Sequence, residues 1–518
     1  MKGKRVFHGT VALPVFPSWR SSDCTEPCHW DKKSPLGTTV LLENQVIVVS
    51  LSCGKIEAIG HASEPWAKKI LQTSSIAGAS IDSEREENYF VELGPSEIIC
   101  PGFVDCHIHA PQFSYCGTAT DRPLMGPDGW LEKYTFPAER SLGEDAERAR
   151  HVFESVVDRT LRCGTTTACY FATVKANPTK ILVDVMAERG QRGFAGNVCM
   201  DRCGPGDYIM STEENIAETR EVIEFILSHG SGGIVQPIIT PRFIPSCTPQ
   251  LMEALGNLKK EYDERLGGNG IHVQSHISES DDEVIFSREI DLADRDLIGV
   301  DGAASRTDTE IFDSHGLLSR NCMMAHGTHL TDSDLSILGE RGVGIAHCAL
   351  SNYYFSGRTL HVKHLLEKGV RVGMGTDVAG GYSPSMMDAA RCTVVASRGL
   401  QQTMRAVNDA MESIETRSKG AAGSGNEHID PTIDYLHAFY LATLGGASAL
   451  GIHEKVGTFK KGMEFDAIIL NVSVGKNICI FDTDNVQDIF QKLCTQGDDR
   501  NVVKVYVKGR EVVNNLRQ

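Results

Sequence analysis

The stretch Pro101-Gly-Phe-Val-Asp-Cys-His107-Ile-His109-Ala-Pro-Gln112 decides the fold. It predicts a buried strand, from Glu97 to Val104, that runs out into an open loop carrying two histidines. Residues i and i+2 of a strand point to the same side, so His107 and His109 can face one ion together. Imidazole is a common zinc ligand, and such a pair at a strand end supplies half of a metal site. Two histidines with purely structural hydrogen bonds are the alternative.

Composition limits the classes of partner. The chain of 518 residues is 41% hydrophobic and 23% charged, as in ordinary globular proteins, and its length predicts two or more domains. A net charge of -17 argues against nucleic acid or an anionic membrane surface as the main partner. The N-terminus lacks the apolar core of a secretory signal, and no stretch is apolar enough to span a bilayer. The 16 cysteines include no Cys-x-x-Cys pair, which is typical of a reducing compartment, so we expect a cytoplasmic protein.

Both ends of the chain have a β-rich sequence pattern that differs from the pattern of the middle. Residues 1–98 contain short strands broken by Gly and Asn turns, and residues 457–518 repeat this pattern. We therefore predict one small β-sandwich domain formed by both chain ends, with residues 99–456 as a separate domain between them.

The middle of the chain alternates short apolar strands with longer helical stretches such as 146–162, 212–229 and 331–340. This α/β pattern is typical of βα units around a parallel sheet. Eight expected strands cover 98–105, 165–171, 193–200, 234–241, 271–276, 322–326, 342–347 and 370–376. Eight such units predict a (β/α)8 TIM-type barrel, whereas a doubly wound open sheet would call for a Gly-x-Gly-x-x-Gly after the first strand. Residues 73–88 and 411–427 are polar and aperiodic, and we expect inserted surface loops there.

Histidine and aspartate residues that could bind a metal ion stand where the expected strands end. Beyond His107 and His109, the fifth strand ends at His276, the sixth at His326, the seventh at His347 and the eighth at Asp377. Active sites of such barrels lie at the carboxyl ends of the strands, so these side chains are expected to meet. Three imidazoles and a carboxylate suit one zinc or iron ion with a position open for water. The fourth strand offers no Lys that could bridge a second metal.

The chain resembles the guanine deaminases of the amidohydrolase superfamily over nearly its whole length. The motifs that carry the likeness are the opening stretch extended to Phe113, Lys133-Tyr-Thr-Phe-Pro-Ala-Glu139, Thr240-Pro-Arg-Phe243, Gln274-Ser-His-Ile-Ser-Glu279, Met324-Ala-His-Gly327 and Gly375-Thr-Asp-Val-Ala-Gly-Gly-Tyr382. The resemblance implies hydrolysis of guanine to xanthine and ammonia in purine catabolism, and it implies a homodimer.

The resemblance also implies one zinc per chain and a set of site residues. The zinc ligands would be His107, His109, His276 and Asp377. Glu279, His326 and Asp377 would be catalytic, with His326 beside a zinc-activated water and Glu279 shuttling protons. The substrate would contact His109, Ala110, Pro111, Gln112, Arg242, Phe243, His276, Glu279 and Asp377.

These implied roles agree with general chemistry. A bound metal lowers the pKa of water toward 7, and the resulting hydroxide would attack C2 of the purine. Glu279 follows His276 by three residues, where a carboxylate could move protons to the ring and to the leaving amine. The Arg242 guanidinium could bind the O6 and N7 edge of guanine, the Gln112 amide another edge, and Phe243 a ring face. Taken alone, each of these three could equally be an ordinary structural residue.

Other functions stay open at this point. Related amidohydrolases that act on pterins, cytosine, adenosine-type nucleosides or triazines would share the metal set and differ in the pocket. A barrel that has lost its chemistry would be expected to lack some of the site residues, yet all are present. The unrelated zinc deaminases are excluded, since neither His-x-Glu nor Pro-Cys-x-x-Cys occurs. The stretch His347-Cys-Ala-Leu-Ser-Asn-Tyr-Tyr354 departs from the family pattern and could shape the pocket.

Overall fold

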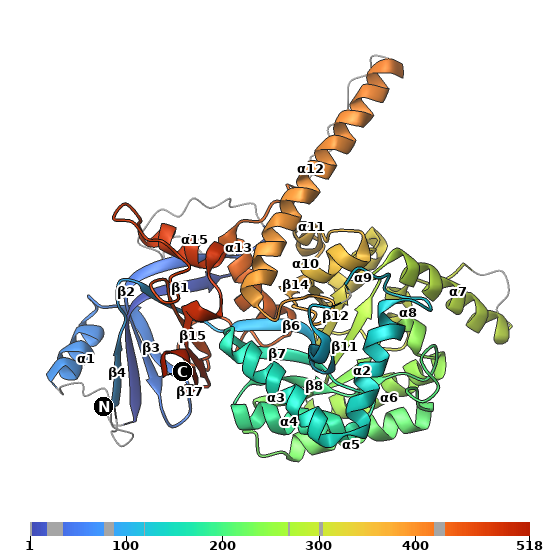
Figure 1. Cartoon of the computed structure of the whole chain (residues 1–518), viewed down its shortest axis with the longest axis horizontal. Helices are drawn as coiled ribbons and strands as arrows, with labels where there is room; N and C mark the ends of the chain where they lie inside the picture. The colour runs from blue at the N-terminus through green and yellow to red at the C-terminus, as the bar shows by residue number, and fades with distance from the viewer. Residues whose placement is uncertain are drawn as a thin grey trace.

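The computed structural model describes residues 3–17, 35–76, 88–118, 120–267, 270–299, 304–418 and 430–517; for 74–76, 88–89, 409–418 and 517 it describes the backbone alone. Two sheets lie side by side (Figure 1). One is a nearly closed parallel barrel surrounded by helices, and the other is formed by strands from both ends of the chain. The fold is therefore the α/β barrel with a smaller β unit that the sequence predicts.

The barrel strands follow one another in the order β6-β7-β8-β10-β11-β12-β13-β14, all parallel, with the short β9 beside β10. Their bounds are β6 Phe103–His109, β7 Thr165–Phe171, β8 Arg192–Gly196, β9 Val198–Cys199, β10 Val235–Pro241, β11 His272–Ile277, β12 Cys322–His326, β13 Gly344–His347 and β14 Arg371–Met374. Nearly every residue of these strands is buried, which explains their continuous apolar character. Across the seam, the Asp377 N–H donates to the His107 carbonyl at 2.9 Å, so the loop after β14 completes the ring.

The second sheet combines strands from both ends of the chain in the order β17-β16-β15-β5-β1-β2-β3, with β4 beside β1. The bounds are β1 Lys4–Val15, β2 Thr38–Ser50, β3 Ile56–His61, β4 Asn88–Glu92, β5 Glu97–Pro101, β15 Ala467–Asn471, β16 Val502–Val507 and β17 Arg510–Asn514. The junction is the antiparallel pair β5 and β15. The domain boundaries at 98 and 456 stay a prediction.

The first expected strand, 98–105, is wrong as a single strand. Residues up to Pro101 belong to β5 in the end sheet, and β6 of the barrel begins at Phe103. Gly102 lies between them, where a Cβ would come within 2.2 Å of the Thr166 side chain. The apolar run continues through both strands because both are buried, so hydrophobicity alone does not mark the break.

Most helices fill the connections between strands and cover the barrel, whereas α1 packs against the end sheet (Figure 1). They are α1 Pro65–Ile76, α2 Phe136–Glu144, α3 Ala146–Arg162, α4 Ala176–Arg189, α5 Thr212–Ser228, α6 Pro249–Leu266, α7 Asp281–Leu297, α8 Asp308–Ser314, α9 Asp332–Arg341, α10 Ala349–Ser351, α11 Val362–Glu367, α12 Met386–Ser418, α13 Tyr435–Tyr440, α14 Gly446–Ala449 and α15 Val486–Gln496. Side-chain caps fix several starts; Ser211 with Glu214 and Thr331 with Asp334 form capping boxes.

Helix α12 differs from the expected structure, because it covers part of a region predicted to be a loop. It extends away from the rest of the molecule (Figure 1). The sequence predicts a loop at 411–427, but the backbone is helical through Ser418, and 419–427 lie outside the described residues. In the other expected insertion, α1 continues to Ile76, and 77–87 are also outside the described part of the chain.

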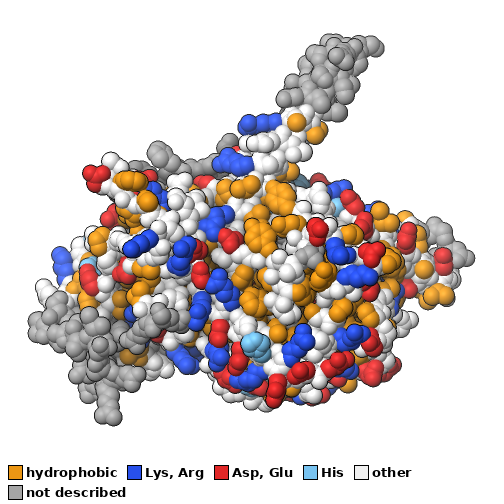
Figure 2. Space-filling view, viewed as in Figure 1, with side chains coloured by type: hydrophobic (Ala, Val, Ile, Leu, Met, Phe, Trp, Pro, Cys, Tyr) orange, Lys and Arg blue, Asp and Glu red, His pale blue; other side chains and the backbone are white. Residues whose placement is uncertain are grey.

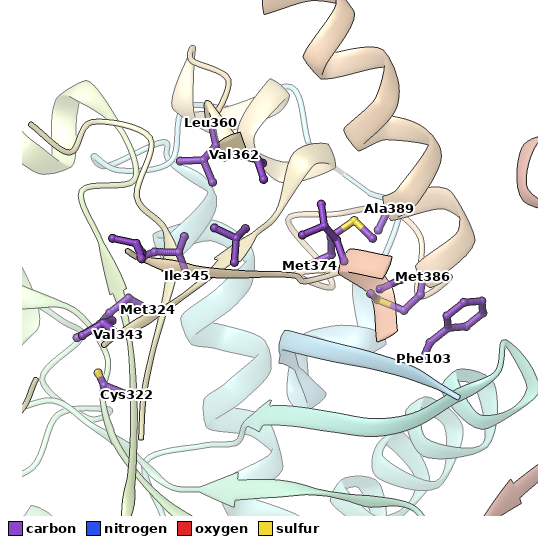
Figure 3. Close-up of a cluster of buried hydrophobic side chains, with 14 of the residues drawn as sticks. Phe103, Cys322, Met324, Val343, Ile345, Leu360, Val362, Met374, Met386 and Ala389 are labelled. Carbon is purple, nitrogen blue, oxygen red and sulfur yellow. The ribbon is translucent and has the colours of Figure 1, made fainter. Parts of the chain in front are cut away.

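The largest hydrophobic core lies between the barrel and its helices. Figure 3 shows Met324, Ile345 and Met374 from three neighbouring strands, with Leu360 and Val362 packed near the end of this layer. Burial of each such side chain contributes about 1.5–3 kcal/mol, so this packing fixes the strands that carry the site residues. Rigid strands in turn hold side chains at their ends in defined positions.

The molecular surface carries mixed charge. Figure 2 shows Lys and Arg side chains interspersed with Asp and Glu over the visible face. No helix within the described ranges is long and apolar enough to cross a membrane. The 14 cysteines among the described residues are all free thiols.

Candidate active site

Five barrel strands bring His or Asp to one rim of the barrel, as the sequence predicts. The side chains are buried, and they comprise His107 and His109 on β6, His276 on β11, His326 on β12, His347 on β13 and Asp377 after β14. Potential metal ligands cluster in two overlapping groups among the described residues: the first contains His107, His109 and His276, and the second contains His107, His326, Cys348 and Asp377. His347 is the one predicted rim histidine outside these groups.

The four expected metal ligands lie within direct reach of one another. His107 Nε2 is 3.1 Å from Asp377 Oδ1, and His109 Nε2 is 3.5 Å from the same oxygen. His109 Nε2 and His276 Nε2 are 3.1 Å apart. Three imidazole nitrogens and one carboxylate oxygen therefore converge on one point from β6, β11 and the loop after β14.

The protonation of these side chains suits a cation. Burial, together with neighbouring rings, lowers the pKa of His107, His109 and His276 well below the usual imidazole value, so the rings are neutral. His107 Nε2 is buried without a hydrogen-bond partner among the described residues. The Nδ1 nitrogen of His276 lies 2.6 Å from the Arg242 carbonyl oxygen, so Nδ1 carries the proton and Nε2 keeps its lone pair. The donor set fits a metal ion.

Asp105 supports this cluster, although the sequence analysis gave it no role. Its Oδ1 accepts from the Thr376 N–H at 3.0 Å, and its Oδ2 accepts from the Thr376 hydroxyl at 2.5 Å. Burial raises its pKa to about 7. Asp105 thus joins the strand of the two histidines to the loop of Asp377, which has a left-handed φ of 48°. In the sequence, Asp105 stands out only as a carboxylate within an apolar run. Its partner Thr376 is 271 residues away, so no local pattern indicates the contact.

Glu279 lies beside the metal-ligand cluster at the loop after β11. Its Oε1 is 3.5 Å from His326 Nε2, and its own N–H donates to the buried Glu283 at 2.9 Å. Burial and the nearby Asp377 raise the pKa of Glu279 well above the usual carboxyl value, although Arg242 opposes the shift. This side chain therefore keeps its proton to a higher pH than an exposed carboxyl group does.

His326 adopts a fixed orientation next to Asp377 and Glu279. Its Nδ1 is 3.0 Å from Asn352 Oδ1, an acceptor, which places the ring proton on Nδ1. Its Nε2 is 3.8 Å from Asp377 Oδ2 and faces the cluster as an acceptor. Asn352 belongs to η6 (Asn352–Ser356), within the seventh-strand segment that sequence analysis expected to shape the pocket.

A hollow opens beside these groups. Apolar side chains form much of its wall, among them Leu124, Trp130, Leu131, Phe243 and Phe355. Of the residues expected to contact substrate, those on its wall are His109, Gln112, Arg242, Phe243, His276, Glu279 and Asp377. Ala110 and Pro111 are buried in the short helix η2 (Ala110–Tyr115) and do not form part of the wall.

Arg242 and Gln112 meet at a buried carboxylate that the sequence analysis missed. Both side chains donate to Glu139 of α2, which has no exposed surface. Glu139 was visible only as the last residue of the motif Lys133-Tyr-Thr-Phe-Pro-Ala-Glu139. No spacing rule connects it to Arg242, which is 103 residues away.

Known proteins resemble the chain in both sequence and structure. The profile of the amidohydrolase family matches residues 98–512. Over 428 residues the chain is 37% identical to a guanine deaminase of Dictyostelium discoideum and 40% identical to one of Homo sapiens, covering 82% of this chain and 85% and 84% of those proteins. A solved guanine deaminase from C. acetobutylicum, with guanine bound in its active site, superimposes with a TM-score of 0.75 at 26% identity. The superposition covers 98% of this chain and 100% of that one. The chain belongs to the amidohydrolase family, among the guanine deaminases.

Proposed function

We infer that the chain hydrolyses guanine to xanthine and ammonia. The observation that carries this conclusion is the position of the buried His and Asp cluster, which lies on the wall of the same hollow as Arg242, Gln112 and Phe243. The first group supplies hydrolytic chemistry, and the second supplies hydrogen bonds and an apolar face for a planar heterocycle. Similarity to a guanine deaminase with bound guanine supports the same substrate.

One zinc ion per chain, held by His107, His109, His276 and Asp377, is the cofactor that we propose. Neutral imidazoles and a carboxylate are typical zinc ligands, and the orphaned His107 Nε2 supports the assignment. When bound, zinc lowers the pKa of a water molecule toward 7 and so supplies hydroxide at neutral pH.

The chain's own residues then move the protons. Addition of water oxygen to C2 of guanine leaves one proton to be placed on the adjacent ring nitrogen and one on the departing amine. Glu279, with its raised pKa, receives a proton and delivers it to the ring nitrogen. His326 Nε2 and the free oxygen of Asp377 accept hydrogen bonds from the attacking water and orient it. Breaking the C2–N bond releases ammonia and leaves a carbonyl at C2.

Substrate recognition is proposed for Arg242, Gln112 and Phe243, which lie on the wall of the same hollow. The Arg242 guanidinium donates to the O6 and N7 edge of guanine, and Gln112 binds another polar edge. Phe243 supplies an apolar ring face. Ala110 and Pro111 act through the short helix that places Gln112, since their side chains are not on the wall.

The family resemblance supports further proposals about the whole protein. We propose a homodimer in the cytoplasm that acts in purine catabolism and has no nucleic acid or membrane partner. We also propose that residues 1–98 and 457–518 form one domain and residues 99–456 the other, which the pairing of β5 with β15 supports.

The direct test follows guanine turnover by ultraviolet absorbance on the purified protein. Adenine, cytosine and a pterin are measured in parallel, and zinc content is measured on the same sample. We expect guanine-selective deamination with about one zinc per chain, the stoichiometry of a single three-His, one-Asp site. Bound zinc without guanine turnover would contradict the proposed substrate and keep the metal site.

A further inference from the structure

Glu139 is a charged side chain without exposed surface in the wall beside the proposed substrate pocket. Its carboxylate accepts four hydrogen bonds: from Gln112 Nε2 at 3.1 Å, Tyr208 Oη at 2.7 Å, Arg242 Nη1 at 2.8 Å and Arg242 Nη2 at 3.2 Å. A buried carboxylate is stabilised only when it is paired and hydrogen-bonded, and here one residue binds both of the polar groups assigned to purine recognition.

The ion pair fixes the plane of the Arg242 guanidinium. Two parallel N–H donors, one from each terminal nitrogen, bind the two oxygens of Glu139. The guanidinium carbon also lies 5.2 Å from the centre of the Phe136 ring, one helical turn before Glu139 on α2. Glu139 uses two of the five N–H groups, and Nη1 also donates to Met200 Sδ at 3.9 Å, so one N–H on Nη2 and the one on Nε are left for a ligand.

The same carboxylate fixes which way the Gln112 amide faces. Its Nε2 donates to Glu139, and its Oε1 accepts from the backbone N–H of Ala379 at 3.2 Å. The reversed amide would place an oxygen against the carboxylate and an NH2 group against an N–H. Gln112 therefore presents one remaining N–H and one remaining lone pair in defined directions.

We propose that Glu139 is a positioning residue for substrate specificity, which orients Arg242 and Gln112 so that the pocket prefers a purine with a carbonyl at C6. This inference rests on the proposed function, because it takes Arg242 as the group that binds the O6 edge. A flexible Arg side chain would lose more conformational freedom on binding, whereas a prefixed guanidinium binds its acceptor with less entropy loss.

The test uses two competitive inhibitors of guanine turnover that cannot be deaminated. Hypoxanthine has a carbonyl at C6 and a proton on N1, and unsubstituted purine has neither, so the ratio of their inhibition constants measures recognition of the edge formed by C6 and N1. Hydrogen bonds to charged groups discriminate by about tenfold or more. We expect hypoxanthine to bind the wild-type zinc enzyme more tightly than purine by this factor. Glu139→Gln should abolish most of this preference and leave the zinc content unchanged.

A control separates positioning from mere stability. Asp466 forms another buried two-point pair, with Arg192 at the start of β8 and therefore at the opposite end of the barrel. Asp466→Asn should destabilise the protein and leave the inhibitor ratio unchanged. If Glu139→Gln does not fold, Glu139→Asp is the second variant. Its side chain keeps the charge but is one methylene too short to bind both partners, so it should lower the ratio as well.

The outcomes distinguish the two proposals. Absence of guanine turnover in the wild-type protein would overturn the proposed function. Guanine turnover with a wild-type inhibitor ratio in the folded Glu139 variant would overturn the inference alone. An equal loss of the ratio in Asp466→Asn would also overturn it, because the effect would then be general loosening of the barrel.

Discussion

At the scale of single residues, the rim of the barrel contains carboxylates in three different environments. Asp377 faces the imidazoles, Glu139 is paired with Arg242, and Glu279 is buried beside Asp377 with a raised pKa. Burial raises the pKa of both Asp377 and Glu279, which line the hollow, and Glu279 is the one of the two that is not an expected metal ligand. The local environment, rather than the residue type, therefore gives each carboxylate its task.

The role of Glu279 can be tested with an isosteric change. Glu279→Gln removes the proton-carrying group and keeps the volume and a hydrogen-bonding amide. We expect the guanine turnover number to fall by roughly 10²–10⁴-fold, with zinc content unchanged. Steady-state kinetics and metal analysis on the same preparation measure both quantities, and unchanged turnover would remove Glu279 from the proton transfer.

Asn352 allows a second test, which concerns the orientation of His326. Asn352→Leu removes the acceptor of the His326 Nδ1 proton, so the ring is free to adopt the other tautomer. Loss of such an outer partner should lower the turnover number by about 10–100-fold with little change in KM. Ser356→Ala is the matched control, because Ser356 Oγ lies at the longer distance of 3.5 Å from Asn352 Oδ1 and should change turnover little. Equal effects of both substitutions would contradict a specific role of Asn352.

Sequence predicts those site residues that stand at strand ends, and it misses those that support them from elsewhere. His107, His276 and Asp377 are identified because parallel strands must bring their ends together. Asp105 and Glu139 are not, since each acts on a partner that is 271 or 103 residues away. A hydrogen bond between distant segments depends on three-dimensional packing and leaves no periodic pattern in the chain.

At the scale of elements, periodicity predicts regular segments well and their ends less well. The expected helix at 146–162 coincides with α3 (Ala146–Arg162), because its apolar positions recur at helical spacing and Asp145 caps its start. The continuous apolar run at 98–105 conceals two strands in different sheets. The polar stretch expected to be a loop at 411–427 is helical through Ser418, as part of α12. Tertiary context decides in the last two cases.

His272 at the start of β11 makes stability depend on pH. Burial lowers its pKa from 6.5 to about 4, and its Nε2 donates to the Leu450 carbonyl. The unfolded chain therefore binds this proton more readily, so the free energy of unfolding should fall as pH drops from about 6.5 to about 4, by up to about 3 kcal/mol. Above pH 6.5 the group has no effect.

The measurement is denaturant unfolding of wild type and His272→Gln at pH 7, 5.5 and 4.5. Glutamine keeps an N–H donor for Leu450 and cannot be protonated in this range. We expect a shallower loss of stability with acid in the variant. Parallel curves for the two proteins would show that His272 does not titrate as its burial predicts.

At the scale of the whole molecule, one buried ion pair joins the barrel to the end sheet. Arg192 begins β8, and Asp466 directly precedes β15; Asp466 Oδ1 also accepts from the Lys508 N–H at 2.7 Å. Burial lowers and ion pairing raises the pKa of Arg192, and the pairing prevails. The contact ties together segments that are 274 residues apart.

Breaking this contact should lower the stability of the protein and leave its catalytic activity nearly unchanged. Asp466→Asn leaves the Arg192 charge buried with one fewer carboxylate partner, and we expect the free energy of unfolding to fall by about 3–5 kcal/mol. The kcat/KM for guanine should stay within twofold or so of wild type, as expected for a change remote from the reacting groups. Thermal unfolding and kinetics at a temperature where both proteins are folded provide the measurement. A large loss of kcat/KM in the folded variant would show that the two units are coupled to the site.

The pairing of β5 with β15 also has a consequence for biosynthesis. Cys100 and Ile468 are partners in this ladder although 368 residues separate them. At translation rates of about 5–20 residues per second, the ribosome needs roughly 20–70 s to make the intervening chain. During that time the nascent β5 presents an unpaired edge that later becomes completely buried. This interval is the period in which the growing polypeptide depends most on chaperones to avoid aggregation.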